Sequence, residues 1–346
     1  MIKSLLKDTA IYGLSDMILK VLAFFTFPIF AHLLSVSEYG VMQLITTISG
    51  IVAIFINLGI NNAVSRYYYD PEMNEVGRPL LVSTGLYMLL ISSLVVTFVA
   101  SVLFFFVKDY LQVKFEVVWL VLVIGLASNI PTQLIQYAND TIRLHFSPLK
   151  FTILAFIKNL AAIFLSIWFL KNGKGLEGYF EALLIGPLVF IPLALFFIKK
   201  DLRLKWDTAV AKKLFRYGYP FIFASLGYWL FGSIDRWLLG VYSNSEEIGL
   251  YSIAFKFATL ILFISSAFGQ AWSPLAIKMM KDAPTDYKTA FSSILTILYA
   301  VLCIIGIGVS LFSYEFLRFT TPQAYWPAAN SVVFLSMALV INGTTQ

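Results

Sequence analysis

The chain has 346 residues, of which 59% are hydrophobic and only 13% are charged, and its mean hydropathy is +0.82. Soluble domains carry about 25% charged residues and cannot bury this much apolar surface, so the composition excludes a soluble globular protein. The net charge of +6 does not indicate a nucleic-acid partner, because the basic residues lie mainly in alternate loops between apolar segments.

Ten apolar segments follow one another along the chain, and most are long enough to cross a hydrocarbon core of roughly 30 Å as a helix. They cover residues 9–34, 39–65, 80–106, 116–139, 149–170, 176–198, 216–241, 248–276, 288–311 and 327–343. The sequence therefore predicts an all-α polytopic membrane protein with about ten transmembrane helices.

The loops between these segments alternate between strongly and weakly basic. The N-terminus and the loops on its side hold 16 of the 25 basic residues, and the loops on the other side hold five. Because cytoplasmic loops of membrane proteins carry the excess of Lys and Arg, we expect the N-terminus to lie in the cytoplasm.

The longest polar interruption runs from Lys199 to Arg216 and contains seven basic and two acidic residues. We expect an amphipathic cytoplasmic linker over 199–215 that joins two membrane lobes. The N-terminal lobe, 1–198, would contain six helices. The C-terminal lobe, 216–346, would contain about four and is expected to be incomplete.

A short motif in the first external turn, Ser37–Val41, reappears 209 residues later as Glu246–Leu250. The segments that follow carry polar side chains along one helical face in the same register. The first stripe is Gln43, Thr47, Gly50, Asn57 and Asn61, and the second is Ser252, Lys256, Thr259, Ser266 and Gln270. A third stripe, in the fourth apolar segment and just beyond it, is Asn129, Gln133, Gln136, Asp140 and Arg143.

Such stripes face protein or water, because polar groups are costly against lipid. A single stripe is explained well by helix–helix packing, in which small and polar residues are common. Three stripes, two of them related by a repeat, favour a shared hydrated cavity, because repeated halves with a site between them are a common transporter plan.

Six charged residues lie well inside predicted spans: Asp16, Lys20, Lys158, Asp235, Arg236 and Lys256. Each would cost a few kcal/mol at the bilayer centre, so each needs a partner or a hydrated surface. Their excess of two positive charges favours an anionic ligand such as a phosphate or pyrophosphate. Ion pairing between helices, or extension of the side chain toward the interface, is the structural alternative.

The candidate cavity residues are therefore Asp16, Lys20, Asn57, Asn61, Gln133, Lys158, Asp235, Arg236, Lys256, Ser266 and Gln270. Arg66 and Arg143 sit at predicted cytoplasmic helix ends, where they act as topology signals or grip a head group at the cavity mouth. The sequence offers no phosphate-binding loop, catalytic constellation or ligand-spaced histidines, so we expect no enzyme activity, cofactor or metal site.

The chain resembles polysaccharide biosynthesis proteins of the O-antigen flippase type, within the multidrug/oligosaccharidyl-lipid/polysaccharide exporter superfamily. The similarity covers nearly the whole chain, although its motifs are diffuse. It is carried by the runs Asp8–Gly13, Pro28–Ser35, Glu38–Gly40, Asn57–Gly59 with Ala63 and Arg66, Asp235–Gly240 and Glu247–Ser252.

This resemblance implies two lobes in a V-shaped helical bundle that works by alternating access in the cytoplasmic (inner) membrane of a bacterium or archaeon. It implies as substrate an oligosaccharide on undecaprenyl pyrophosphate, such as an O-antigen, capsule or exopolysaccharide repeat unit. Membrane lipids, a polysaccharide polymerase and glycosyltransferases are the implied partners. Members have twelve to fourteen helices, and this chain departs from that number.

Two alternatives remain open at the level of sequence. A cation-coupled multidrug antiporter of the same superfamily would need an unpaired interior carboxylate and an acidic cavity. A non-transporting partner of a polysaccharide assembly complex would need neither. A membrane glycosyltransferase is disfavoured because no soluble loop is large enough to carry catalytic acids.

Overall fold

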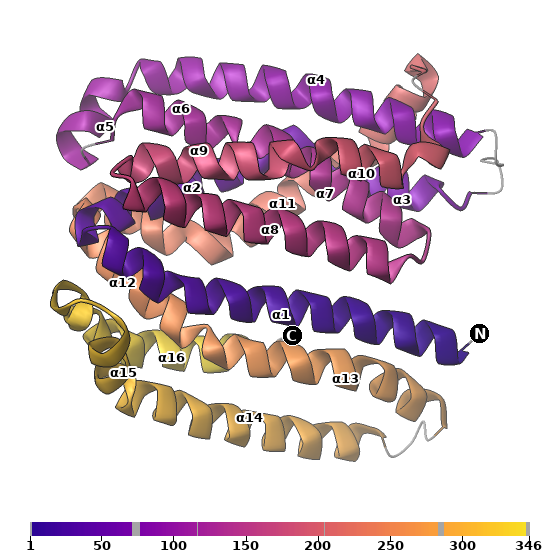
Figure 1. Cartoon of the computed structure of the whole chain (residues 1–346). Helices are drawn as coiled ribbons and strands as arrows, with labels where there is room; N and C mark the ends of the chain where they lie inside the picture. The colour runs from indigo at the N-terminus through magenta and orange to yellow at the C-terminus, as the bar shows by residue number, and fades with distance from the viewer. Residues whose placement is uncertain (1, 71–76, 116, 204, 283–286, 344–346) are drawn as a thin grey trace. The chain divides into compact units, whose positions relative to one another are not determined.

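The computed structural model describes residues 2–70, 77–115, 117–203, 205–282 and 287–343 (Figure 1). Of residues 2–10, 16, 270, 271, 273–275, 277, 278, 280–282 and 287, it describes the backbone alone. Within these ranges every regular element is helical, which confirms the predicted all-α class.

Sixteen α-helices and two short 3-10 segments make up the described ranges. In chain order they are α1 (Ile2–Leu33), α2 (Val36–Asn57), α3 (Ile60–Tyr67), α4 (Gly77–Phe105), α5 (Lys108–Phe115), α6 (Trp119–Ala127), α7 (Asn129–Leu144), α8 (Pro148–Lys171), α9 (Gly175–Val189), α10 (Ile191–Phe197), η1 (Lys199–Asp201), α11 (Thr208–Tyr242), α12 (Ser245–Ala258), α13 (Leu260–Asp282), α14 (Tyr287–Leu311), α15 (Ser313–Thr320), η2 (Gln323–Ala328) and α16 (Ala329–Gly343).

Nine helical stretches in the described ranges are long and apolar enough to cross a membrane, so the chain is a multi-pass membrane protein. The predicted segment 216–241 is not among them. It lies within α11, a helix of 35 residues whose tyrosines, glycines and Asp235–Arg236 pair lower its hydropathy. The other nine predicted segments correspond to these nine stretches.

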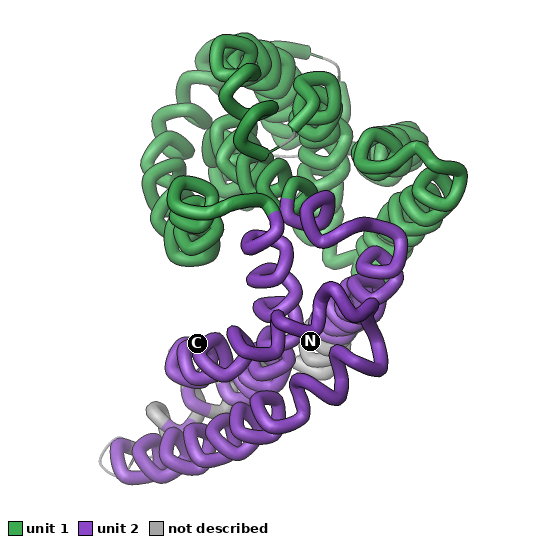
Figure 2. The backbone as a smooth tube through the Cα atoms, turned by 90° about the vertical axis from the view of Figure 1, so that its left-hand side faces the viewer, with its two compact units in different colours: residues 1–12, 41–245 green, residues 13–40, 246–346 purple. Residues whose placement is uncertain are grey.

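The chain forms two compact units (Figure 2). Unit 1 comprises residues 1–12 and 41–245, and unit 2 comprises 13–40 and 246–346. The predicted basic linker lies entirely in unit 1, where Lys199–Asp201 forms η1 and Asp207 caps α11 by accepting a 3.0 Å hydrogen bond from the Val210 amide. The predicted lobe division at 199–215 stays a prediction.

In unit 1, α8 and α9 lie side by side through small residues (Figure 1). A Cβ atom at Gly186 would lie 2.9 Å from the Cα of Ala162, so only glycine permits this approach. A second apolar cluster joins α7, α8 and α10; its buried members are Ile135, Ala138, Ile142, Phe151, Leu154, Ala194 and Ile198. These contacts hold α7 and α8 in place, and both helices contribute polar residues to the site described below.

In unit 2 the buried apolar cluster joins α12 and α13 to α14 and α16, and comprises Ala258, Ile261, Leu302, Leu339 and Val340. The Tyr325 hydroxyl donates a 2.9 Å hydrogen bond to the Leu34 carbonyl oxygen. This bond joins residues 291 positions apart, so a specific buried contact ties residues 13–40 to the C-terminal part of unit 2.

Four of the helices predicted as continuous are interrupted. Segments 176–198 and 248–276 break at Phe190 and Thr259, and the other two breaks lie in the segments that carry the first and third polar stripes. Segment 39–65 divides into α2 and α3 at Leu58 and Gly59, whose φ angles are +50° and +70°. The fourth segment divides into α6 and α7 at Ser128, three residues before Pro131, because proline has no amide to bond the preceding turn. The Ser128 hydroxyl and Asn129 amide donate to the carbonyls of Gly125 and Leu126, which satisfies backbone groups at this interruption.

The glycine of the repeated motif has a structural role in unit 2. A Cβ atom at Gly249 would lie 2.2 Å from the Val36 carbonyl oxygen. The second copy of the motif therefore packs directly on the backbone at the start of α2, next to the first copy.

We predict that Gly249→Ala destabilises the protein, by about 1–3 kcal/mol as for other overpacked sites, because the methyl group meets a carbonyl oxygen of the backbone. Gly308→Ala is the matched control, since a Cβ atom there has no neighbour within 4 Å. Thermal unfolding in detergent measures both. Equal midpoints for the two variants would contradict the close approach.

Candidate functional site

The interruption between α2 and α3 is covered by a backbone contact from α11. A Cβ atom at Gly59 would lie 2.1 Å from the Gly218 carbonyl oxygen, and one at Gly218 would lie 2.6 Å from the Leu58 carbonyl oxygen. The left-handed backbone at Gly59 also favours glycine. This crossing holds Asn57 at the end of α2 and Asn61 in the first turn of α3.

Both asparagines meet polar side chains of α7. The Asn57 amide lies 3.5 Å from the Gln133 side-chain oxygen, and the Asn61 amide donates a 2.6 Å hydrogen bond to Asp140 Oδ2. Gln136 donates a 3.1 Å hydrogen bond to Asp140 Oδ1. The first and third polar stripes of the sequence therefore face each other, and three predicted residues, Asn57, Asn61 and Gln133, belong to one polar layer.

A pocket of about 310 Å³ lies in the same unit, between the spans that carry these stripes. Its wall includes Lys158 from α8, and its other polar members are Thr46, Ser49, Ser128, Asn129, Thr132 and Asn159. The volume is at the lower end of the range of ligand pockets, roughly 300–1,000 Å³. It suits a small part of a ligand, with one cationic group and many groups that hydrogen-bond.

The amides and hydroxyls of the pocket are held by the helix backbone. Asn159 donates to the Ala155 carbonyl at 2.7 Å, and Thr46 donates to the Met42 carbonyl at 2.7 Å. These bonds use one donor of each side chain and leave the side-chain oxygen as an acceptor. The wall therefore presents oriented acceptors next to the Lys158 ammonium group, a combination suited to hydroxyl-rich and anionic ligands.

Asp140 adds a carboxylate to the charges predicted for the membrane interior. It lies within the fourth span, Trp119–Leu144, and interacts electrostatically with Lys158 and Arg143. Arg143, three residues further on, lies in the same stretch, so the two residues together add one charge of each sign. In unit 1 the interior is therefore a cation and a carboxylate set among amides, and not a purely basic lining.

The remaining predicted residues of unit 1 lie elsewhere. Asp235 and Arg236 are half-buried on α11, where Asp235 accepts from the Arg236 backbone amide at 2.8 Å and Arg236 Nη1 donates to the Gly232 carbonyl. Arg66 and Arg143 are exposed at the ends of α3 and α7, and Arg143 stacks on the Phe151 ring at 4.3 Å.

Three predicted residues lie in unit 2. Lys20 is exposed on α1, Lys256 is half-buried in the last turn of α12, and Ser266 donates to the Phe263 carbonyl within α13. The side chains of Asp16 and Gln270 lie outside the described residues. A cavity shared by the residues of both units stays a prediction.

Sequence reasoning left eight polar pocket or network residues out of the candidate set: Thr46, Ser49, Ser128, Asn129, Thr132, Gln136, Asp140 and Asn159. Asp140 belongs to the third stripe but lies one residue beyond the predicted end of its span at 139. Thr46 and Ser49 are offset from the main stripe of their helix. Asn159 follows Lys158 directly, and only the packing of α8 shows that both line the wall.

The described helices and their order define a known class of fold. The structure resembles a MATE family multidrug resistance transporter of the MOP superfamily solved in an inward-facing conformation (TM-score 0.69, 16% identity), with 98% of this chain and 80% of that chain covered. It also resembles a mutant of the Vibrio cholerae MATE transporter VcmN (TM-score 0.64, 15% identity, 99% and 81% covered). The fold is thus that of the MATE transporters.

Sequence comparison then places the chain in its family. A family model described as polysaccharide biosynthesis protein matches residues 5–280, so the chain belongs to the polysaccharide biosynthesis protein family. A Haemophilus influenzae relative described as an uncharacterized membrane protein is 25% identical over 297 residues, covering 82% of this chain and 68% of the relative. The resemblance identified from the sequence is confirmed at the level of the family, and the fold agrees with it.

We predict that Asn61 and Asp140 are energetically coupled, because a 2.6 Å hydrogen bond to a carboxylate is stronger than one between neutral groups. A double-mutant cycle with Asn61→Ala and Asp140→Asn, read by thermal unfolding in detergent, should give a coupling of about 1–2 kcal/mol. Pairing Asp140→Asn with Asn172→Ala, an exposed residue after α8, should give additive effects. Additivity in the first cycle would show that the bond contributes nothing.

Proposed function

We propose that the chain is a flippase that moves an undecaprenyl-pyrophosphate-linked oligosaccharide across the cytoplasmic membrane by alternating access. The observation that carries the proposal is the polar pocket of unit 1, in which Lys158 stands among amides and hydroxyls between apolar spans. Family membership supports the same substrate class. The proposal makes the protein a transporter without a catalytic step.

The chemistry of the pocket suits the polar part of such a substrate. Sugar hydroxyls both donate and accept hydrogen bonds, and the wall offers amide and hydroxyl groups fixed by the backbone. A lysine ammonium group binds phosphate oxygens as a point charge. The pocket is too small for the whole substrate. We therefore propose that it binds one segment of the substrate while the remainder stays outside unit 1.

The helix interruptions support alternating access. Breaks in membrane helices are tolerated where their backbone groups are satisfied, and transporters place binding groups at such breaks. In unit 1, Asn57 and Asn61 flank one break, and Ser128 and Asn129 lie at the other. We propose that the N-terminus faces the cytoplasm and that glycosyltransferases and a polymerase act before and after translocation.

We predict that Lys158→Gln lowers flipping of a fluorescent undecaprenyl-pyrophosphate oligosaccharide in proteoliposomes by about tenfold or more, since a hydrogen bond to a charged group is worth roughly 1.5–3 kcal/mol. Lys171→Gln, an exposed lysine at the end of α8, is the matched control and should keep wild-type activity. Flipping is read as the movement of the fluorescent lipid out of the leaflet that the quencher reaches. The variants are compared at equal protein incorporation.

Three outcomes would count against the flippase. One is wild-type flipping by Lys158→Gln, and another is an equal loss in both lysine variants. The third is normal surface polysaccharide with Lys158→Gln in cells. Retained complex assembly without any flipping by the wild type would favour the non-transporting assembly partner instead.

Asp140 favours a second candidate, a cation-coupled antiporter, because an intramembrane carboxylate is a site for Na⁺ or a proton. The solved MATE neighbours include a multidrug resistance transporter. Another, from Pyrococcus furiosus, is described as having a binding pocket of reverse polarity that suggests a different function (TM-score 0.56, 14% identity). Pocket polarity is therefore the property that separates the two candidates.

We predict that the wild type exports no ethidium from everted vesicles under a Na⁺ or proton gradient. Asp140→Asn should reduce lipid flipping less than Lys158→Gln, because the flippase uses the cation and the carboxylate mainly balances it. Gradient-driven ethidium export that Asp140→Asn abolishes and lipid-linked sugar leaves unaffected would reverse the assignment.

A further inference from the structure

A basic cavity lies apart from the polar pocket, where the ends of several helices of unit 1 meet. The helix-end basin, as we call it, has a volume of about 870 Å³ and is lined by polar, charged and a few apolar residues from the end of α3, the start of α4, the end of α7, the start of α8, the end of α10 and η1. Its charged members are Arg78, Lys150, Lys199, Lys200 and Asp201.

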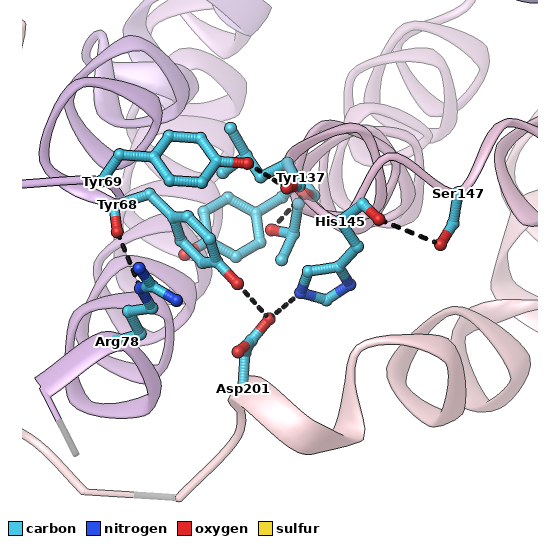
Figure 3. A network of polar contacts seen from close by, with 9 residues as sticks. Tyr68, Tyr69, Arg78, Tyr137, His145, Ser147 and Asp201 are labelled. Carbon is cyan, nitrogen blue, oxygen red and sulfur yellow. Dashed lines mark hydrogen bonds and ion pairs between the residues drawn. The ribbon is translucent and has the colours of Figure 1, made fainter. Parts of the chain in front are cut away.

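The single carboxylate of the basin is already engaged. Asp201 is 7% exposed, and its Oδ2 atom accepts a 3.2 Å hydrogen bond from the Tyr68 hydroxyl and a second bond from His145 Nε2 (Figure 3). Burial, and then the nearby Asp201 charge, raise the pKa of Tyr68, so its phenol remains a neutral donor. Asp201 therefore holds Tyr68 and His145 together at the base of the basin, and its Oδ2 atom is occupied by these two residues.

The four basic residues keep their charges for another ligand. Arg78 Nε donates a 3.0 Å hydrogen bond to the Tyr68 carbonyl, and its guanidinium stacks on that ring at 5.2 Å (Figure 3). Lys150 and Lys199 lie over phenylalanine rings of α10 at 5.9 and 4.2 Å. In the described ranges, none of the four forms an ion pair with a carboxylate. Among its lysine, arginine and aspartate side chains, the basin has three positive charges in excess.

Exposed apolar side chains border this charged cavity. Phe146, Leu149 and Phe196 are 57%, 67% and 57% exposed, and they lie beside His145, Lys150 and the basin wall respectively. The neighbouring spans, α8 and the stretch Gly175–Phe197, are apolar enough for the membrane. A molecule that fits both surfaces has an anionic group joined to a hydrocarbon chain.

We propose that the helix-end basin binds the phosphate group of an anionic membrane lipid. The lysines supply charge to the phosphate oxygens, Arg78 is held in a fixed orientation by two contacts with Tyr68, and the chain of the lipid lies along the exposed apolar side chains. The phosphate belongs either to a bulk phospholipid or to a polyprenyl diphosphate. The inference does not rest on the substrate proposed above, because the basin and the polar pocket share no residue.

A simpler account is that these lysines only orient the chain in the membrane. That account needs a number of positive charges on one side but no common cavity. A variant that removes three lysines from the basin can therefore be compared with one that removes three lysines elsewhere in the same predicted set of loops.

The test uses detergent-purified full chain and native mass spectrometry with phosphatidylglycerol, phosphatidylcholine, undecaprenyl diphosphate and inorganic pyrophosphate. Lys150→Gln, Lys199→Gln and Lys200→Gln are combined, and Arg78 is kept because it packs on Tyr68. The control combines Lys205→Gln, Lys212→Gln and Lys288→Gln, all exposed and outside the basin. Unfolding midpoints verify that both variants are folded.

We expect the basin variant to lose affinity for phosphatidylglycerol or undecaprenyl diphosphate about tenfold or more, the control to change less than twofold, and phosphatidylcholine to bind weakly to all. Loss confined to undecaprenyl diphosphate would identify that lipid as the source of the phosphate, and loss confined to phosphatidylglycerol would identify a bulk lipid. Equal losses in basin and control variants, unchanged lipid binding, or binding of pyrophosphate without binding of either anionic lipid would overturn the proposal.

Discussion

Every interruption of a helix within the membrane must satisfy its own polar groups, and this constraint shapes unit 1. At Leu58–Gly59 the chain turns through two left-handed residues, and α11 closes over the turn through Gly218. At Ser128 the carbonyls of the preceding turn accept bonds from Ser128 and Asn129. Lipid offers no hydrogen bonds, so the contacts made at these breaks determine where asparagine and glutamine side chains can lie together.

The predictable part of the fold is the part that hydrophobicity alone decides. The apolar runs locate nine of the ten predicted segments, because burial in hydrocarbon requires about 20 apolar residues in succession. The break at Leu58–Gly59 was not predictable in this way, since Asn57 and Asn61 fit the register of a continuous helix. Its signal was the Asn57–Gly59 run, whose glycine becomes interpretable only when Gly218 is known to lie against it.

The part of the site that could be predicted is the part that depends on which residues share one helix face. The stripes of the second and fourth segments do meet, through Asn57 with Gln133 and Asn61 with Asp140. What the sequence did not locate is the end of the fourth segment: its predicted end is residue 139, whereas the apolar helical stretch Trp119–Leu144 includes Asp140. The cavity expected to be lined by both Lys256 and Arg236 depends on long-range geometry that periodicity does not contain.

The crossing of Gly59 and Gly218 has a mechanical consequence. Two helices usually interlock through side chains, and sliding one over the other requires those side chains to disengage. At this crossing backbone meets backbone, with no side chain on either residue. The distance at which α11 crosses the break is therefore fixed by the two backbones themselves, and a methyl group on either residue would push the helices apart.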